Sequence, residues 1–113
     1  MVKPDRAART ARLTLSAAHL AMLLAVLPAA APAADLGQGR SLYLAHCSGC
    51  HGAGGFSDMS QVPNFARGER LDQPDTVLID AIRSGNDAMP PFLGILDDRE
   101  ILDVIAYMRT LLR

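Results

Sequence analysis

Five consecutive residues, Cys47-Ser48-Gly49-Cys50-His51, concentrate the chemistry of this sequence. Two thiols three positions apart, followed at once by an imidazole, form the C-x-x-C-H pattern of covalent haem attachment. The thiols add to the two vinyl groups of a porphyrin, and one turn of backbone sets their separation. The next residue then lies over the ring, where its imidazole can reach the iron. The sequence therefore predicts one haem c, bound covalently at Cys47 and Cys50, with His51 as an axial iron ligand.

Other sites also use two cysteines at this spacing. A structural disulfide is the usual pairing in an exported protein, but it leaves the adjacent His51 unexplained. A zinc site needs four ligands, and after residue 33 the cysteines and histidines are all crowded into one turn. A thioredoxin-like dithiol requires a βαβ context, and no strand pattern is present. Haem attachment is the interpretation that accounts for the whole motif.

The ligand on the other face of the iron separates electron transfer from ligand binding. A second strong ligand gives an electron-transfer centre, whereas an open face allows binding or catalysis. Met89 is the predicted ligand, because it follows His51 by 38 residues and precedes two prolines that stiffen its loop. Met59 follows by only eight residues in a Gly-rich loop, and Met108 lies on an apolar helical stripe. These two remain the alternatives.

Residues 1–33 are predicted to be a secretory signal peptide. Basic residues are followed by an Ala/Leu-rich run and then by Ala31-Pro32-Ala33, which matches the A-x-A cleavage pattern. Cleavage before Ala34 would leave a periplasmic domain, residues 34–113, with no stable membrane insertion. Without cleavage the segment would be a membrane anchor, although only about 15 of its residues are strongly apolar, which is short for a span.

The predicted domain is acidic. Residues 34–113 contain seven Arg, no Lys, nine Asp and two Glu, so their formal charge is −4. This balance argues against a nucleic-acid partner, because phosphate contacts require basic groups. It favours protein partners that present a positive patch.

The pattern of apolar residues predicts an all-α fold. One helix is expected from Asp35, its N-cap, to about His46, with an apolar face that includes Leu36, Gly39, Leu42, Tyr43 and Ala45. A second should run from about Asp75 to Ser84, between Pro74 and Gly85. A third should begin at a capping box of Asp97 and Glu100 and bury a stripe made up of Ile101, Val104, Ile105, Met108, Leu111 and Leu112. Gly39 is expected where the first and last helices touch, with Tyr107 near Tyr43.

The ordered set of Gly39, Tyr43, the haem motif, Met89-Pro90 and Tyr107 resembles the class I cytochromes c, specifically the small bacterial members. The resemblance covers residues 35–113 and implies three to four helices wrapped around one haem, with His51 and Met89 as iron ligands. It also implies that Pro63 is the loop proline whose carbonyl accepts a hydrogen bond from the ring of His51. The chain departs from mitochondrial cytochrome c in having no lysine-rich docking face.

The function expected from these features is one-electron transfer by a monomer, with no substrate turnover site. Its redox partners would be a dehydrogenase, a membrane complex or a terminal oxidase. One alternative is a haem-bearing subunit fixed in a dehydrogenase complex. Another is a haem-based ligand-binding or peroxidase-like protein, which would need an open sixth position and is disfavoured by Met89.

Overall fold

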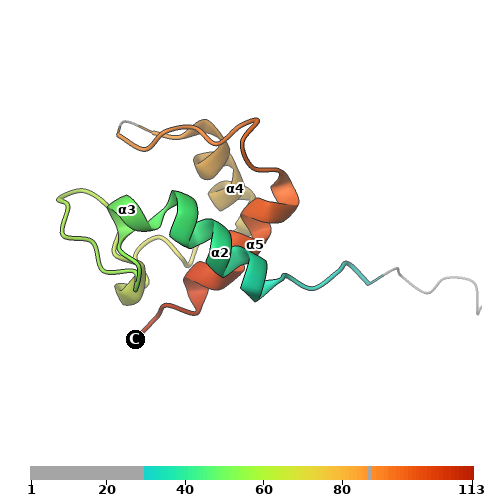
Figure 1. Ribbon diagram of the computed structural model, residues 1–113, viewed down its shortest axis with the longest axis horizontal. Helices are drawn as coiled ribbons and strands as arrows, with labels where there is room; N and C mark the ends of the chain where they lie inside the picture. Colours follow the sequence, from blue (N-terminus) through green and yellow to red (C-terminus); the bar gives the residue numbers. More distant parts are fainter. Residues whose placement is uncertain (1–29, 87) are drawn as a thin grey trace, which may run out of the picture. The chain divides into compact units, whose positions relative to one another are not determined.

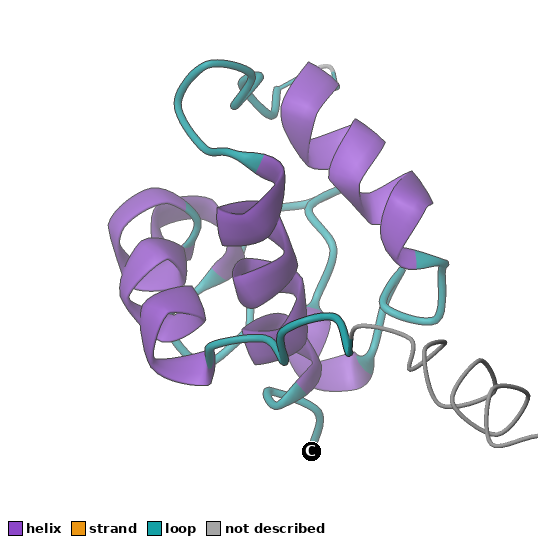
Figure 2. Cartoon of the chain, turned by 90° about the vertical axis from the view of Figure 1, so that its right-hand side faces the viewer, coloured by secondary structure: helices purple, strands orange, loops and turns teal. Residues whose placement is uncertain are grey.

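The computed structural model describes residues 30–86 and 88–113, so the predicted signal peptide, residues 1–33, lies almost wholly outside the described part. Residues Pro32–Arg113 form one compact unit. Its elements are α2 (Leu36–His46), α3 (Ser48–His51), the 3₁₀ turn η1 (Phe65–Arg67), α4 (Asp75–Ser84) and α5 (Asp98–Arg109) (Figure 1). The described residues contain two isolated β-bridges and no β-strand, which confirms the all-α prediction (Figure 2). None of these helices has the length and apolar character needed to cross a membrane.

The helix ends follow the predicted caps. The side chain of Asp35 accepts a hydrogen bond from the backbone N–H of Gln38, which satisfies one free donor in the first turn of α2. Pro74 and Gly85 bound α4, as predicted. At the start of α5, Asp97 and Glu100 form a reciprocal capping box with hydrogen bonds of 2.8 and 3.0 Å.

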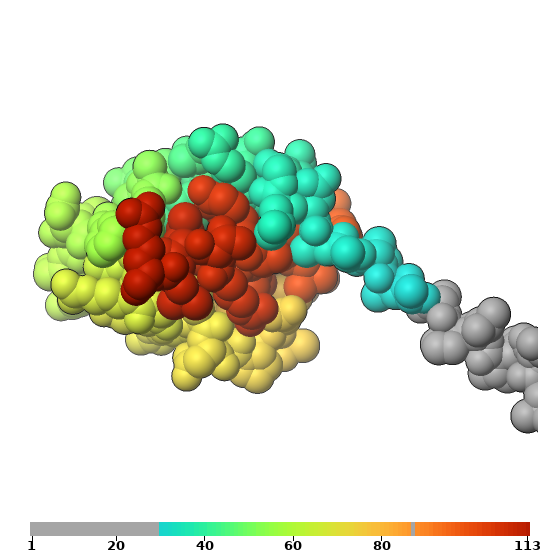
Figure 3. Space-filling model, turned by 90° about the horizontal axis from the view of Figure 1, so that it is seen from below, coloured from blue at the N-terminus to red at the C-terminus, as the bar shows by residue number. Residues whose placement is uncertain are grey.

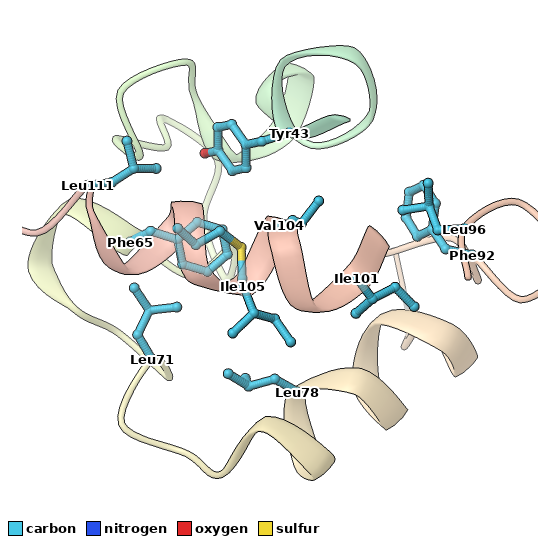
Figure 4. Packing of buried hydrophobic residues seen from close by; sticks show 11 residues of the cluster. Tyr43, Phe65, Leu71, Leu78, Phe92, Leu96, Ile101, Val104, Ile105 and Leu111 are labelled. Carbon is cyan, nitrogen blue, oxygen red and sulfur yellow. The ribbon is translucent and has the colours of Figure 1, made fainter. Parts of the chain in front are cut away.

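Helices α2 and α5 touch at Gly39, which confirms the reason for a glycine inside a helix. A Cβ atom at this position would lie 2.0 Å from the backbone oxygen of Asp103, so only glycine allows this approach. The rings of Tyr43 and Tyr107 then meet across the contact with centroids 5.4 Å apart. The crossing therefore places Tyr43 over the C-terminal half of α5 (Figure 4).

Helix α5 is the centre of the hydrophobic core. One of its faces buries Ile101, Val104, Ile105 and Met108. Around them lie buried residues from the other segments: Tyr43, Phe65, Leu71, Leu78, Phe92, Leu96 and Leu111 (Figure 4). We refer to these eleven residues as the core cluster. Met108 is part of this cluster, as expected from its position on the apolar stripe.

Arg109, near the end of α5, holds the loop that leads into α4. Its guanidinium donates hydrogen bonds to the carbonyl oxygens of Leu71 and Gln73 at 3.3 and 3.1 Å. It also forms an ion pair with Asp75 at 2.7 Å. Figure 3 shows the result on one face, where the C-terminal residues, in red, lie between α2 and the loop before α4, in yellow.

Three predicted core positions are wrong. Leu36 and Ala45 of α2 are exposed, because α5 covers only the side of α2 that carries Gly39 and Tyr43. Leu112 is exposed as well, since α5 ends at Arg109 and its helical periodicity does not continue beyond that residue. The 3₁₀ turn η1 was not predicted, because three residues are too few to show a period.

Candidate functional site

The haem motif forms a single turn directly after α2. Cys47 is the C-cap of α2 and the N-cap of α3. The backbone N–H of His51 donates to the carbonyl of Cys47 at 3.0 Å. The hydroxyl of Ser57 donates to the carbonyl of Cys50 at 2.7 Å and fastens the end of this turn. Both cysteines are free thiols; Cys47 is half-buried and Cys50 is exposed. Burial, and secondarily Cys50, raises the pKa of the Cys47 thiol to about 11.

The imidazole of His51 is buried and held on two sides. Its ring stacks on Phe65, with centroids 4.4 Å apart and an interplanar angle of 13°. Its Nδ1 lies 3.2 Å from the carbonyl oxygen of Pro63. A carbonyl can only accept a hydrogen bond, so this contact places the proton on Nδ1 and leaves Nε2 with its lone pair free. Burial lowers the pKa of His51, against a smaller opposing effect of the Pro63 carbonyl, and so favours the neutral ring that a metal ligand requires.

Tyr43 fixes the chain immediately after His51. Its side chain is fully buried, and its hydroxyl donates to the carbonyl of Gly52 at 2.7 Å. Gly52 has a φ of 77°, and a Cβ there would lie 1.9 Å from the backbone oxygen of Phe56. The turn beyond the motif therefore depends on glycine at this position.

The loop carrying Met89 is anchored to the end of α4. Asn86 and Met89 exchange two backbone hydrogen bonds, of 2.7 and 3.1 Å. Gly85 passes so close to this turn that a Cβ would lie 2.4 Å from the backbone oxygen of Met89. After the prolines, the N–H of Phe92 donates to the carbonyl of Ile82 at 3.1 Å. The backbone of Met89 is thus fixed on both sides.

The structure places Cys47 and Met89 against the same core cluster, although they are distant in sequence. Both are partly buried. In contrast, Met59, in the loop after the haem motif, is 51 % exposed. Phe56 is also exposed, and its ring lies under the guanidinium of Arg113.

Two contacts of this site were not predicted: the Phe65 ring stacked on His51, and the Tyr43 hydroxyl bound to Gly52. Both residues belong to the core cluster, so their aromatic character alone did not separate a positioning role from packing. Adjacency to Pro63 was the available signal for Phe65, since it follows that proline by only two residues.

The residues present fit a covalently bound haem. Two free thiols lie within one turn, and the next residue is a neutral imidazole whose Nδ1 is occupied and whose Nε2 is free. Met89 offers a neutral thioether from a fixed loop. Imidazole and thioether are the donors that hold iron in electron-transfer haem proteins.

Comparisons with known proteins point to one family. Residues 34–108 match the family described as "Cytochrome C oxidase, cbb3-type, subunit III". The chain is 34% identical over 100 residues to cytochrome c6 of Thermosynechococcus vestitus, a match covering 85% of this chain and 87% of that protein. Cytochrome c6 of Thermostichus vulcanus is 33% identical over the same shares of both chains.

A solved structure shows the same fold. Cytochrome c6 from the diatom Phaeodactylum tricornutum is 34% identical and superposes with a TM-score of 0.55, covering 67% of this chain and 92% of the diatom protein. The family match, the identity to the relatives and the shared fold agree with one another. The chain therefore belongs to the class I c-type cytochromes, small one-electron carriers with one covalently bound haem c.

Proposed function

We propose that Cys47 and Cys50 hold the haem through thioether bonds, that His51 and Met89 are its two axial ligands, and that Pro63 orients His51. The observation that carries this proposal is the environment of His51. A buried neutral imidazole, with Nδ1 committed to the Pro63 carbonyl, directly follows the two free thiols. Such a hydrogen bond fixes the tautomer and ring orientation of a ligand and raises its basicity.

The bound haem supplies an iron that takes up and releases one electron. The residues that would hold the iron are restrained, which would lower the reorganisation that accompanies each transfer. Phe65 and Pro63 restrain His51, while the reciprocal Asn86–Met89 bonds and Gly85 restrain Met89. The neutral thioether favours the reduced state and so raises the reduction potential.

The same proposal includes export. Removal of residues 1–33 would release residues 34–113 into the periplasm, an oxidising compartment in which c-type cytochromes exchange electrons with other proteins. The partners we propose are redox proteins, such as a dehydrogenase, a membrane complex or a terminal oxidase, bound through a small transient interface. The formal charge of −4 favours partners with a positive docking patch.

Optical spectra of the exported protein test the ligand assignment. Oxidised protein should show a sulfur-to-iron charge-transfer band, and Met89→Ala should abolish it because the thioether is lost. The reduced Met89→Ala variant should also bind carbon monoxide, which the wild type should bind only slowly.

Met59→Ala is the matched control, because Met59 is exposed and lies outside the core cluster. It should keep the band and exclude carbon monoxide. Loss of the band in Met59→Ala with retention in Met89→Ala would refute the assignment. An exported polypeptide whose mass lacks the porphyrin would refute covalent attachment itself.

A further inference from the structure

Asp103, on α5, is a buried carboxylate that the haem site does not use. Its residue is only 4% exposed, and its Oδ1 accepts a hydrogen bond from the backbone N–H of Asp35 at 2.8 Å. The Nε of Arg99, one turn earlier on α5, lies 3.5 Å from the same oxygen. A buried carboxylate is costly unless it is paired. Here its partners are Arg99 and the backbone of Asp35, the N-cap of α2.

Arg99 holds the chain just before α2. Its guanidinium donates to the carbonyl oxygen of Pro32 at 2.8 Å and to that of Ala33. Arg99 and Asp103 therefore fix both sides of the peptide bond between Ala33 and Ala34. Arg99 holds the carbonyl oxygens of Pro32 and Ala33, and Asp103 holds the amide nitrogen of Asp35. This is the bond at which we propose that the signal peptide is removed.

Hydrolysis of the bond between Ala33 and Ala34 changes the partners of both Arg99 and Asp103. Water adds across the peptide bond, which leaves a carboxylate on Ala33 and an α-ammonium group on Ala34. Pro32 and Ala33 leave with the signal peptide, so Arg99 loses both carbonyl acceptors. Consecutive backbone nitrogens are about 3–4 Å apart, so the new ammonium group is next to the nitrogen that already bonds to Asp103.

We propose that Asp103 is the binding site for the α-ammonium group created at Ala34. The inference rests on the proposed export and cleavage. Both present contacts of the carboxylate use Oδ1, and we assign Oδ2 to the new cation. The precursor is held through Arg99 and the carbonyl oxygens, whereas the processed protein is held through the ammonium group. Processing thus replaces the Arg99 anchor, which holds the chain before α2, by an Asp103 anchor, which holds the new terminus.

The composition of the chain provides a selective test. Residues 34–113 contain no lysine, so the α-amino group of the processed protein is its one primary amine. N-hydroxysuccinimidyl acetate therefore removes a single positive charge. The haem-loaded protein is purified after export, and intact mass verifies both the terminus at Ala34 and the bound porphyrin. Unfolding by guanidinium is then measured with the amine free and acetylated, in wild type, Asp103→Asn and Asp72→Asn.

Acetylation should raise the unfolding equilibrium constant of wild type by about three- to tenfold, the range of a well-placed ion pair. Acetylation should change the unfolding equilibrium constant of Asp103→Asn little, because the partner carboxylate is gone. Asp72→Asn removes an exposed carboxylate, so it should respond like wild type. Equal responses in all three proteins would overturn the proposal.

A mature terminus other than Ala34 would also overturn it. The visible spectrum of the same sample would still report on the electron carrier, so the two failures are distinguishable. If Asp103→Asn does not fold, the rate of amine acetylation in wild type decides. The folded protein should react at least about threefold more slowly than the protein in guanidinium, because pairing keeps the amine protonated. Equal rates would overturn the proposal.

Discussion

His51, the proposed iron ligand, is positioned by residues that lie around its ring and by the chain that follows it. Phe65 fixes the plane of the ring and the Pro63 carbonyl fixes its proton. Tyr43 then fixes the backbone that follows, through Gly52. The motif singled out His51, but these contacts arise only when segments 8 to 14 residues apart fold together. Spacing in the sequence could therefore locate His51 without revealing what holds it.

Tyr43→Phe tests the hydroxyl in that arrangement. At neutral pH the variant should lose about 1–2 kcal/mol of unfolding free energy, because the partly buried carbonyl of Gly52 loses its donor. Burial is the main cause that raises the pKa of Tyr43 to about 12, above the value of about 10 in the unfolded chain. The folded state thus favours the neutral phenol, whose stabilisation is complete below pH ~10 and is lost as pH rises towards ~12.

Guanidinium titrations between pH 7 and pH ~12 measure this effect. Wild type should lose stability in the alkaline range, and Tyr43→Phe should show a smaller loss there. Tyr107→Phe, which removes the hydroxyl of the neighbouring ring, is the control. An identical alkaline loss in wild type and Tyr43→Phe would contradict the role assigned to this phenol.

Among the elements, the helices with strong end signals were predicted best. The caps of α4 and the capping box of α5 lie within a few residues of the helix they define, so sequence alone locates them. Burial of Leu36 and Leu112 was predicted wrongly, because burial depends on where a neighbouring element ends. Helix α3 is four residues long and has no period to detect. Local chemistry thus predicted the helices, whereas tertiary packing decided which faces are covered.

Gly39→Ala tests the contact between α2 and α5. Alanine ordinarily favours a helix, but here its Cβ would lie 2.0 Å from the backbone oxygen of Asp103. Forcing the helices apart should cost about 2–3 kcal/mol of unfolding free energy, measured in guanidinium. Gly37→Ala, in the same helix, meets only the Asp35 side chain at 3.3 Å and should cost much less. A similar effect of both substitutions would mean that the crossing tolerates a wider separation.

For the molecule as a whole, size limits stability. Residues 34–113 are close to the length at which a single hydrophobic core barely supports folding. The core cluster has eleven members, and Cys47 and Met89 lie at its edge, where a large apolar group would extend it. We therefore expect the bound haem to be part of what stabilises the fold.

Removing both attachment points should accordingly prevent folding. The Cys47→Ser, Cys50→Ser double variant should lose its helical circular dichroism and be degraded after export. Gly49→Ala is the matched control, because its Cβ meets no atom within 4 Å and both thiols remain. A helical, monomeric and haem-free double variant would show that the polypeptide core suffices by itself.

The central place of α5 also sets an order of events. It is the helix against which both α2 and α4 pack, and it follows all other elements along the chain. On the proposed export route the N-terminus emerges first, so α5 is the last of the described helices to emerge. Until then Cys47 has no completed core to cover it. On the proposed export route, the Cys47 thiol thus stays accessible for haem attachment until α5 has packed against α2.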